Sequence, residues 1–149
     1  MKYYIYICHT NIQLTKKHLP MSKKKEIIHV NEFDCDVYPI TLWVGISEDF
    51  TPILDEFSPD YEDDQTKYAM TFVVAHEEKN KVGTLIIFRD TDFMDFSSVA
   101  HESSHAAKAI FRHVGADINS DECFEYLAGW IAKCCEKSRD AMLKGKKRK

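Results

Sequence analysis

The feature that most constrains the fold is a change in hydrophobic spacing near residue 90. Before it, apolar residues alternate over residues 38–46 and form short β-branched and aromatic runs over 70–76 and 82–88, which is typical of strands. After it, apolar residues recur every three or four positions up to about residue 143, which is typical of helices. Strands followed by helices predict an α+β domain, with helices packed on a small, mostly antiparallel sheet.

Local signals set the ends of the predicted elements. Thr51 followed by Pro52 predicts a helix start, because threonine is a good N-cap and proline is favoured in the first turn. Gly115 is suited to the left-handed position just beyond a helix end. The predicted elements are a strand over 38–46, a helix over 51–57, a hairpin of strands 70–76 and 82–88, a helix over 97–114, and a helix from 119 or 120 to 143.

Length and charge predict one acidic domain between two basic ends. The 149 residues fit a single domain. Residues 1–25 carry six basic and no acidic residues, and residues 144–149 carry five basic and no acidic ones. Residues 26–143 therefore hold all 24 acidic residues beside nine basic ones, a net charge of −15. An acidic body repels phosphate backbones, so nucleic acid is not expected as the main ligand.

The two basic ends are expected to lie outside the packed domain. We expect residues 1–25 to form a poorly packed extension, and Met21-Ser22-Lys23 reads like a natural start within it. Residues 26–143 are then the folded domain and residues 144–149 a solvated basic tail.

The cysteines predict a reducing compartment. There are five of them, an odd number, and no two form a C-x-x-C pair. The apolar stretch near the N-terminus is too short for a secretory signal or a membrane span. Reduced thiols, a cytoplasmic location and no membrane partner are therefore expected. The cysteines are Cys8, Cys35, Cys123, Cys134 and Cys135.

Residues 101–105 read His-Glu-Ser-Ser-His, an H-E-x-x-H sequence inside the predicted helix over 97–114. His101 and His105 are four residues apart, so both imidazoles lie on one helix face and can reach one zinc ion. Glu102 lies about 100° round the helix, where it can take a proton from a zinc-bound water that attacks a carbonyl. The motif also arises by chance, and a histidine pair satisfied within the fold is the alternative.

A catalytic zinc ion has three protein ligands and one open position, so a third ligand is expected downstream. His113 lies roughly 12 Å beyond His105 on the same helix, which excludes it unless the helix breaks. Glu122 is preferred, because residues 116–121 are just long enough to bring the chain back to the histidines. Glu125 is the alternative. The full set of candidates is His113, Asp117, Asp121, Glu122 and Glu125.

Two further residues follow Glu122 on the same face of the last predicted helix. Tyr126 is a candidate donor to a tetrahedral oxyanion, with a buried aromatic as the alternative. Gly129 is expected where the two helices cross, because a glycine within a helix costs about 1 kcal/mol and so suggests a packing reason. His76, beside Glu77 at the hairpin tip, is expected to be exposed.

The sequence V-A-H-E-x-x-H-A-A followed by D-E-C-F-E-Y-L-A-G-W resembles zincin-type metallopeptidases of the gluzincin arrangement. It also resembles small uncharacterised phage-type proteins in which H-E-x-x-H-A precedes a D-E-x-x-x-Y-L-x-G-W helix. The similarity covers about residues 71–131. It implies a minimal zincin with His101, His105 and Glu122 as ligands of one zinc ion and Glu102 as the general base.

The resemblance is incomplete in the residues around the motif. Tyr126 stands where thermolysin-like enzymes carry an aspartate that orients a histidine. Lys108 and Phe111 stand where the metzincin pattern requires a glycine and a third histidine, so that variant does not fit. Orientation of the ligands is then expected from other residues, such as Asp117 or Asp121.

The sequence therefore predicts a zinc-dependent metallopeptidase that hydrolyses peptide bonds with a glutamate-activated, zinc-bound water. The strand over 82–88 is expected at a sheet edge, where it can pair with an extended peptide. The chain is short for a peptidase, so the cleft is expected to be shallow or completed by a protein partner. The alternatives are a non-catalytic zinc-binding module, such as a phage or mobile-element accessory protein, and a hydrolase of another amide or ester. The enzymatic prediction requires that the residue 122 side chain, or another acid, reach residues 101 and 105.

Overall fold

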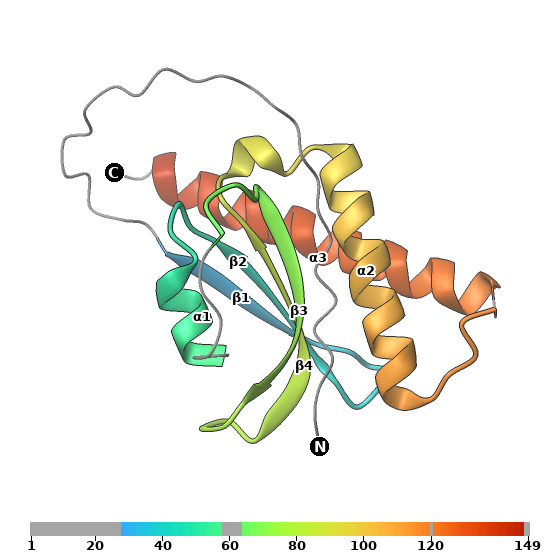
Figure 1. The fold of residues 1–149 in the computed structure, drawn as a ribbon. Helices are drawn as coiled ribbons and strands as arrows, with labels where there is room; N and C mark the ends of the chain where they lie inside the picture. The colour runs from blue at the N-terminus through green and yellow to red at the C-terminus, as the bar shows by residue number, and fades with distance from the viewer. Residues whose placement is uncertain (1–27, 58–63, 120, 148–149) are drawn as a thin grey trace.

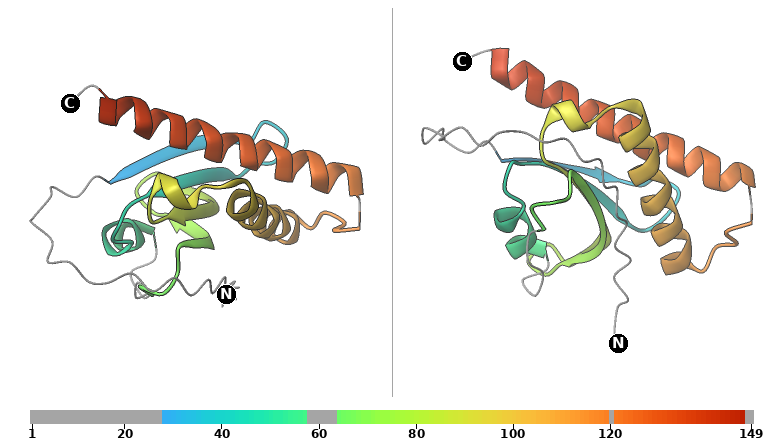
Figure 2. Two further views of the ribbon diagram at one scale, coloured as in Figure 1. Left: turned by 90° about the horizontal axis from the view of Figure 1, so that it is seen from above. Right: turned by 45° about the horizontal axis from the view of Figure 1, so that its top comes forward.

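A four-stranded sheet lies between one helix on one face and two helices on the other (Figures 1 and 2). The computed structural model describes residues 28–57, 64–119 and 121–147. The predicted extension over residues 1–25 lies outside this part of the chain. In chain order the elements are β1 (His29–Asp34), β2 (Thr41–Ile46), α1 (Thr51–Phe57), β3 (Ala69–His76), β4 (Lys81–Phe88), the 3-10 turn η1 (Thr91–Phe93), α2 (Phe96–Val114) and α3 (Asp121–Lys147).

The sheet has the strand order β1-β2-β4-β3. The outer pairs, β1–β2 and β3–β4, are antiparallel, whereas the central pair β2–β4 is parallel. The α+β class is thereby confirmed, and the sheet is mixed with two of its three pairings antiparallel. The prediction that residues 82–88 form an edge strand is wrong, because β4 lies inside the sheet and β3 is the edge. Residues 83–88 are buried throughout, as expected for a strand covered on both faces.

Two apolar clusters hold the layers together, one on each face of the sheet. Leu42, Val44 and Ile86 face α2 and α3. Trp43, Leu85 and Ile87 face α1. Helix α2 packs over β3 and β4, while α3 packs over β1 and β2 and crosses α2. The edge strand β3 therefore lies directly beneath the helix that carries the H-E-x-x-H sequence.

The elements predicted from local signals lie close to where they were expected. The helix over 51–57 is confirmed as α1, and the hairpin strands differ from prediction by one residue at their starts. Helix α2 begins after Asp95, whose Oδ1 accepts a hydrogen bond from the Ser98 N–H at 2.8 Å. It ends at Gly115, which has a left-handed φ of 70° as predicted.

Three further features differ from the sequence prediction. Strand β1 was not predicted, because His29–Asp34 lacks a clean apolar alternation and is held by pairing with β2. Helix α3 continues to Lys147, so most of the predicted basic tail is helical. His76 was expected to be exposed but is 3% exposed, because the turn starts only after it. Its Nε2 lies 2.9 Å from Glu56 Oε1 on α1.

No helix in the described ranges is both long and apolar enough to cross a membrane.

Glu32 ties the edge strand β1 to β2 and to the β3–β4 hairpin. Its carboxylate accepts hydrogen bonds from Trp43 Nε1 at 3.1 Å, Lys79 Nζ at 2.8 Å and Lys81 Nζ at 2.5 Å. These donors, led by the two lysines, lower the pKa of Glu32 from its ordinary value of 4.5 to about 2. The charged form of Glu32 is thus favoured in the folded state.

The lowered pKa of Glu32 predicts a pH-dependent contribution to stability. The carboxylate stabilises the fold above pH 4.5, and this contribution is lost as the pH falls towards 2. Allowing for solvent screening, we expect Glu32→Gln to lower the free energy of unfolding by about 1–2 kcal/mol at pH 7 and by much less near pH 2. Urea unfolding at both pH values measures this, with Glu78→Gln on the exposed hairpin turn as control. An equal loss at both pH values would contradict it.

Candidate metal centre

The H-E-x-x-H residues occupy the first half of α2 and point to different sides of it. His101 and His105 are half-buried on the side away from the sheet, whereas Glu102 is 1% exposed. Their separation follows from helix geometry, because adjacent residues lie about 100° apart and residues four apart nearly overlap. The buried side of α2 consists of Glu102, Ser103, Ala106, Ala107, Ile110 and Phe111.

The two histidines converge through the same ring nitrogen. The Nε2 atoms of His101 and His105 are 3.2 Å apart, and the ring centroids are 4.7 Å apart with the planes at 66°. Two nitrogen ligands of a tetrahedral zinc ion, each at 2.0–2.1 Å, are separated by about 3.3 Å. The pair therefore matches one edge of a zinc coordination tetrahedron.

The surroundings of His105 favour its neutral form. Burial lowers the pKa of His105, and the positive charges of His101, Lys108 and Arg112 lower that pKa further. A histidine must be neutral to ligate a metal ion, because the lone pair of the ligating nitrogen has to be free of its proton. The low pKa of His105 thus keeps it available as a ligand at neutral pH.

Glu102 is held by a residue on the neighbouring strand. Thr71 Oγ1 donates a hydrogen bond to Glu102 Oε2 at 2.5 Å. Burial raises the pKa of the Glu102 carboxyl group, and the hydrogen bond from Thr71 and the charge of His101 partly offset this rise. A carboxylate with a raised pKa is a better proton acceptor, which suits a general base.

Thr71 was missed by sequence reasoning. The alternation of β3 puts Thr71 on the same face as Ala69, a polar residue in a largely apolar strand. That signal marks Thr71 as a half-buried hydroxyl in need of a partner. It does not say which residue of which helix the hydroxyl would meet, because that depends on how α2 crosses the sheet.

The predicted third ligand is not brought to the histidines. Among residues 28–57, 64–119 and 121–147, no group of three His, Cys, Asp or Glu residues lies close enough together to hold a metal ion. Glu122 is exposed. The hollow that it lines together with Glu125 is formed by residues of α3, and none of its lining residues belongs to α2. Coordination by Glu122 would require the start of α3 to move, and Glu122 stays a prediction.

The other candidates for a third ligand lie elsewhere. His113 is exposed near the end of α2, beyond an unbroken helix, in agreement with its exclusion. Asp117 is exposed, and its Oδ1 accepts hydrogen bonds from Asn119. Glu125 shares the hollow of Glu122. The side chain of Asp121 lies outside the described part of the structure.

Tyr126 and Gly129 differ from the packing roles considered for them. Tyr126 is 78% exposed, so the alternative of a buried aromatic is wrong, and its role as an oxyanion donor stays a prediction. A Cβ atom added at Gly129 would meet nothing within 4 Å, so Gly129 does not mark the helix crossing. The crossing uses the opposite face of α3, where Leu127 and Ile131 are buried.

The residues present fit part of a zinc site. His101 and His105 supply two nitrogen donors with the spacing of a tetrahedral edge, and Glu102, next to His101 in the sequence, is a carboxylate that Thr71 holds on the buried side of the helix. A catalytic zinc ion takes three protein ligands, so the described residues provide two of the three. Such a pair can bind a divalent metal ion weakly by itself, and a third donor is needed for tight binding.

Compared with protein-family models, with curated proteins and with solved structures, the chain gives no match.

The histidine pair predicts a zinc affinity that depends on both imidazoles. We expect His101→Ala and His105→Ala each to lower the zinc affinity by more than roughly 100-fold. Loss of a ligand should cost more than loss of a residue that only orients a ligand, which lowers metal affinity by about 10- to 100-fold. Competition with a chromophoric chelator at pH 7 measures the affinity. His113→Ala removes an exposed histidine from the same helix and should change nothing. Unchanged affinity in His101→Ala and His105→Ala would show that the zinc ion is bound elsewhere.

The third ligand is tested in the same titration. We expect Glu122→Gln to weaken zinc binding by about 10- to 100-fold, because an amide is a poorer ligand than a carboxylate. Glu125→Gln, one turn along the same exposed face, is the matched control and should bind zinc like the wild type. A Glu122→Gln protein with unchanged affinity would remove Glu122 from the ligand set.

Proposed function

We propose that the protein is a zinc-dependent hydrolase that cleaves peptide bonds, with His101 and His105 as ligands. The observation that carries the proposal is the 3.2 Å separation of their Nε2 atoms. Glu122 completes the ligand set after a movement of the start of α3, and Tyr126, one turn further on, follows it towards the substrate. A bound zinc ion supplies Lewis acidity to the substrate carbonyl.

Glu102 acts as the general base in this proposal. It follows His101 directly in the sequence, its burial raises its pKa, and Thr71 holds one of its oxygens. The other oxygen is left to take the proton from the attacking water and to pass it on to the leaving amine. Thr71 is a positioning residue, because it fixes the direction of the carboxylate without touching the substrate.

A peptide substrate is favoured by the strand beside the motif. β3 is an edge strand, so one side of its backbone has no strand partner among the residues that the structure describes. It packs under α2, and Thr71 links it directly to Glu102. An extended peptide that pairs with β3 would lie next to the carboxylate and the histidines. With so short a chain, a protein partner is expected to cover the other side of this peptide.

The cytoplasm is the proposed compartment. Cys35, Cys123, Cys134 and Cys135 are all free thiols. Burial raises the pKa of Cys134 to about 11 and that of Cys135 to about 12, so both thiols remain protonated and unreactive. Free, unreactive thiols suit a reducing environment.

A non-catalytic zinc-binding module is the second candidate. It is favoured by the separation of Glu122 from the histidine pair and by the burial of Glu102. In that case zinc would fix the outer face of α2 for a partner, and Glu102 would be a structural carboxylate that binds Thr71.

The Glu102→Gln variant distinguishes the two candidates. Glutamine has the same shape and can still accept the Thr71 hydrogen bond, so we expect the fold and the zinc affinity to be retained. Loss of the base should lower peptide cleavage by about 10²- to 10⁴-fold. The measurement is zinc-dependent hydrolysis of a library of internally quenched peptides, with Glu78→Gln as control. A wild-type protein that binds zinc but cleaves none of the peptides supports the module instead.

A further inference from the structure

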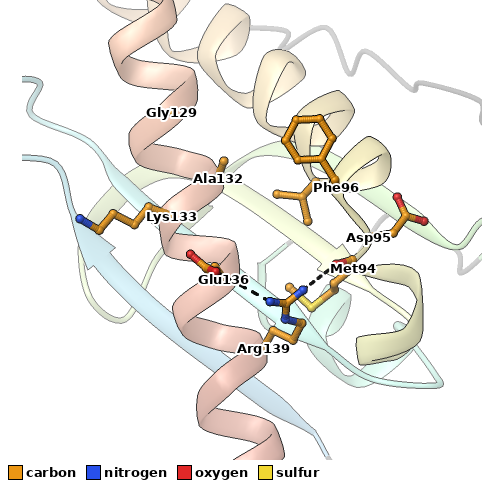
Figure 3. Close-up of a pocket in the computed structure, with 9 residues that line it drawn as sticks. Met94, Asp95, Phe96, Gly129, Ala132, Lys133, Glu136 and Arg139 are labelled. Carbon is orange, nitrogen blue, oxygen red and sulfur yellow. Dashed lines mark hydrogen bonds and ion pairs between the residues drawn. The ribbon is translucent and has the colours of Figure 1, made fainter.

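A groove runs along the outer face of α3, and none of the residues that line it belongs to the histidine pair. It consists of three open hollows of about 520, 550 and 260 Å³. The first two share Gly129 and Lys133, and the second and third share Tyr126 and Trp130. The first lies between the start of α2 and the middle of α3 (Figure 3). We call this surface the α3 groove; it extends from Val37 past Gly129 to Arg139.

The α3 groove exposes large apolar side chains. Phe96 is 91% exposed at one end of the groove, and Val37 and Tyr126 are 77% and 78% exposed at the other. They come from three separate segments of the chain, which the fold brings to one face. Side chains of this kind, gathered along a groove, are typical of a surface that buries a partner.

Gly129 lies at the centre of the α3 groove. A Cβ atom there would meet nothing within 4 Å, so the packing of the chain itself does not require a glycine. Glycine is unfavourable within a helix, and α3 extends for many residues on both sides of it. The missing side chain leaves a depression between the hollows, which allows another backbone to approach α3 closely.

The charge of the α3 groove selects the partner. The α3 groove is lined by five acidic residues and two basic residues. Arg139 is already engaged, because its Nη1 donates to the Met94 carbonyl at 3.2 Å and its Nη2 lies 3.9 Å from Glu136 (Figure 3). A second copy of the chain would bring the same acidic face against this one. The acidic residues are Asp36, Asp95, Glu122, Glu125 and Glu136.

We propose that the α3 groove docks a basic amphipathic helix of a partner protein, which crosses α3 at Gly129. The stretch of α3 from residue 122 to residue 139 is roughly 26 Å long, so a partner helix of similar length fits. Its apolar face contacts Phe96 and Tyr126 at the two ends, and its lysines or arginines face the acidic rim. The proposal does not depend on zinc, because the histidine pair lies outside the groove; Glu122 and Tyr126, which the zinc proposal moves towards that pair, line the groove in the structure as it stands.

The test uses a labelled 18-residue helical peptide with leucines along one face and lysines elsewhere, and a twin in which every lysine is replaced by glutamate. Fluorescence anisotropy with the full chain measures both affinities. We expect the basic peptide to bind on the order of tenfold or more tightly than the acidic twin. Gly129→Leu should weaken the basic peptide by on the order of tenfold, because the leucine fills the contact point.

Gly145→Leu is the matched control. Gly145 is also an exposed glycine of α3 with nothing within 4 Å of an added Cβ, but it lies outside the groove. Both leucine variants should melt no lower than the wild type, since leucine favours helix more than glycine does. His101→Ala should bind the basic peptide normally, so a failure of the zinc proposal leaves this one intact. The proposal is overturned if the basic and acidic peptides bind with equal affinity, or if Gly129→Leu leaves the affinity for the basic peptide unchanged. It is also overturned if sedimentation shows a dimer of the chain that Gly129→Leu dissociates.

Discussion

The packing of α2 against β3 and β4 is the constraint on which the rest of the structure depends. Ala106, Ala107 and Ile110 are small or apolar and fully buried, so the helix lies close to the sheet. Once this face of α2 is packed on the sheet, the helical repeat sets the direction of the other side chains of α2. A residue about 100° round the helix from this face points to the side, and one 180° round points outward. Glu102 is thereby carried into the interface, and His101 and His105 are left on the open side.

A buried carboxylate is a cost that the fold has to offset. Glu102 loses almost all its contact with water, and an unpaired carboxylate there would be strongly unfavourable. Thr71 offsets part of this cost with one short hydrogen bond, and the electrostatic interaction with His101 offsets a smaller part. A fold selected for stability alone would place an apolar residue at this position. The retained carboxylate is thus consistent with a functional role for the motif, whether catalytic or structural.

Helix α3 has two faces with different roles. One face buries Leu127, Ile131 and Cys135 against the sheet and α2. The other carries Glu122, Tyr126 and Gly129, which the sequence assigned to the metal site and the helix crossing. In the structure these three residues line one open surface with aromatic and acidic neighbours. The proposed docking groove accounts for the glycine and for the exposed tyrosine, and the zinc proposal accounts for the glutamate only if α3 moves.

The sequence by itself determined the features that depend on nearby residues. Hydrophobic periodicity defined five of the helices and strands within a few residues, Gly115 marked a helix end, and the i, i+4 spacing brought His101 and His105 together. Contacts between distant segments were decided only by the tertiary structure: the parallel β2–β4 pairing that puts β3 at the edge, the Thr71–Glu102 hydrogen bond, and the direction of Glu122. The physical reason is that helical and strand repeats are local, whereas the crossing of α2 and α3 depends on how all the buried faces pack at once.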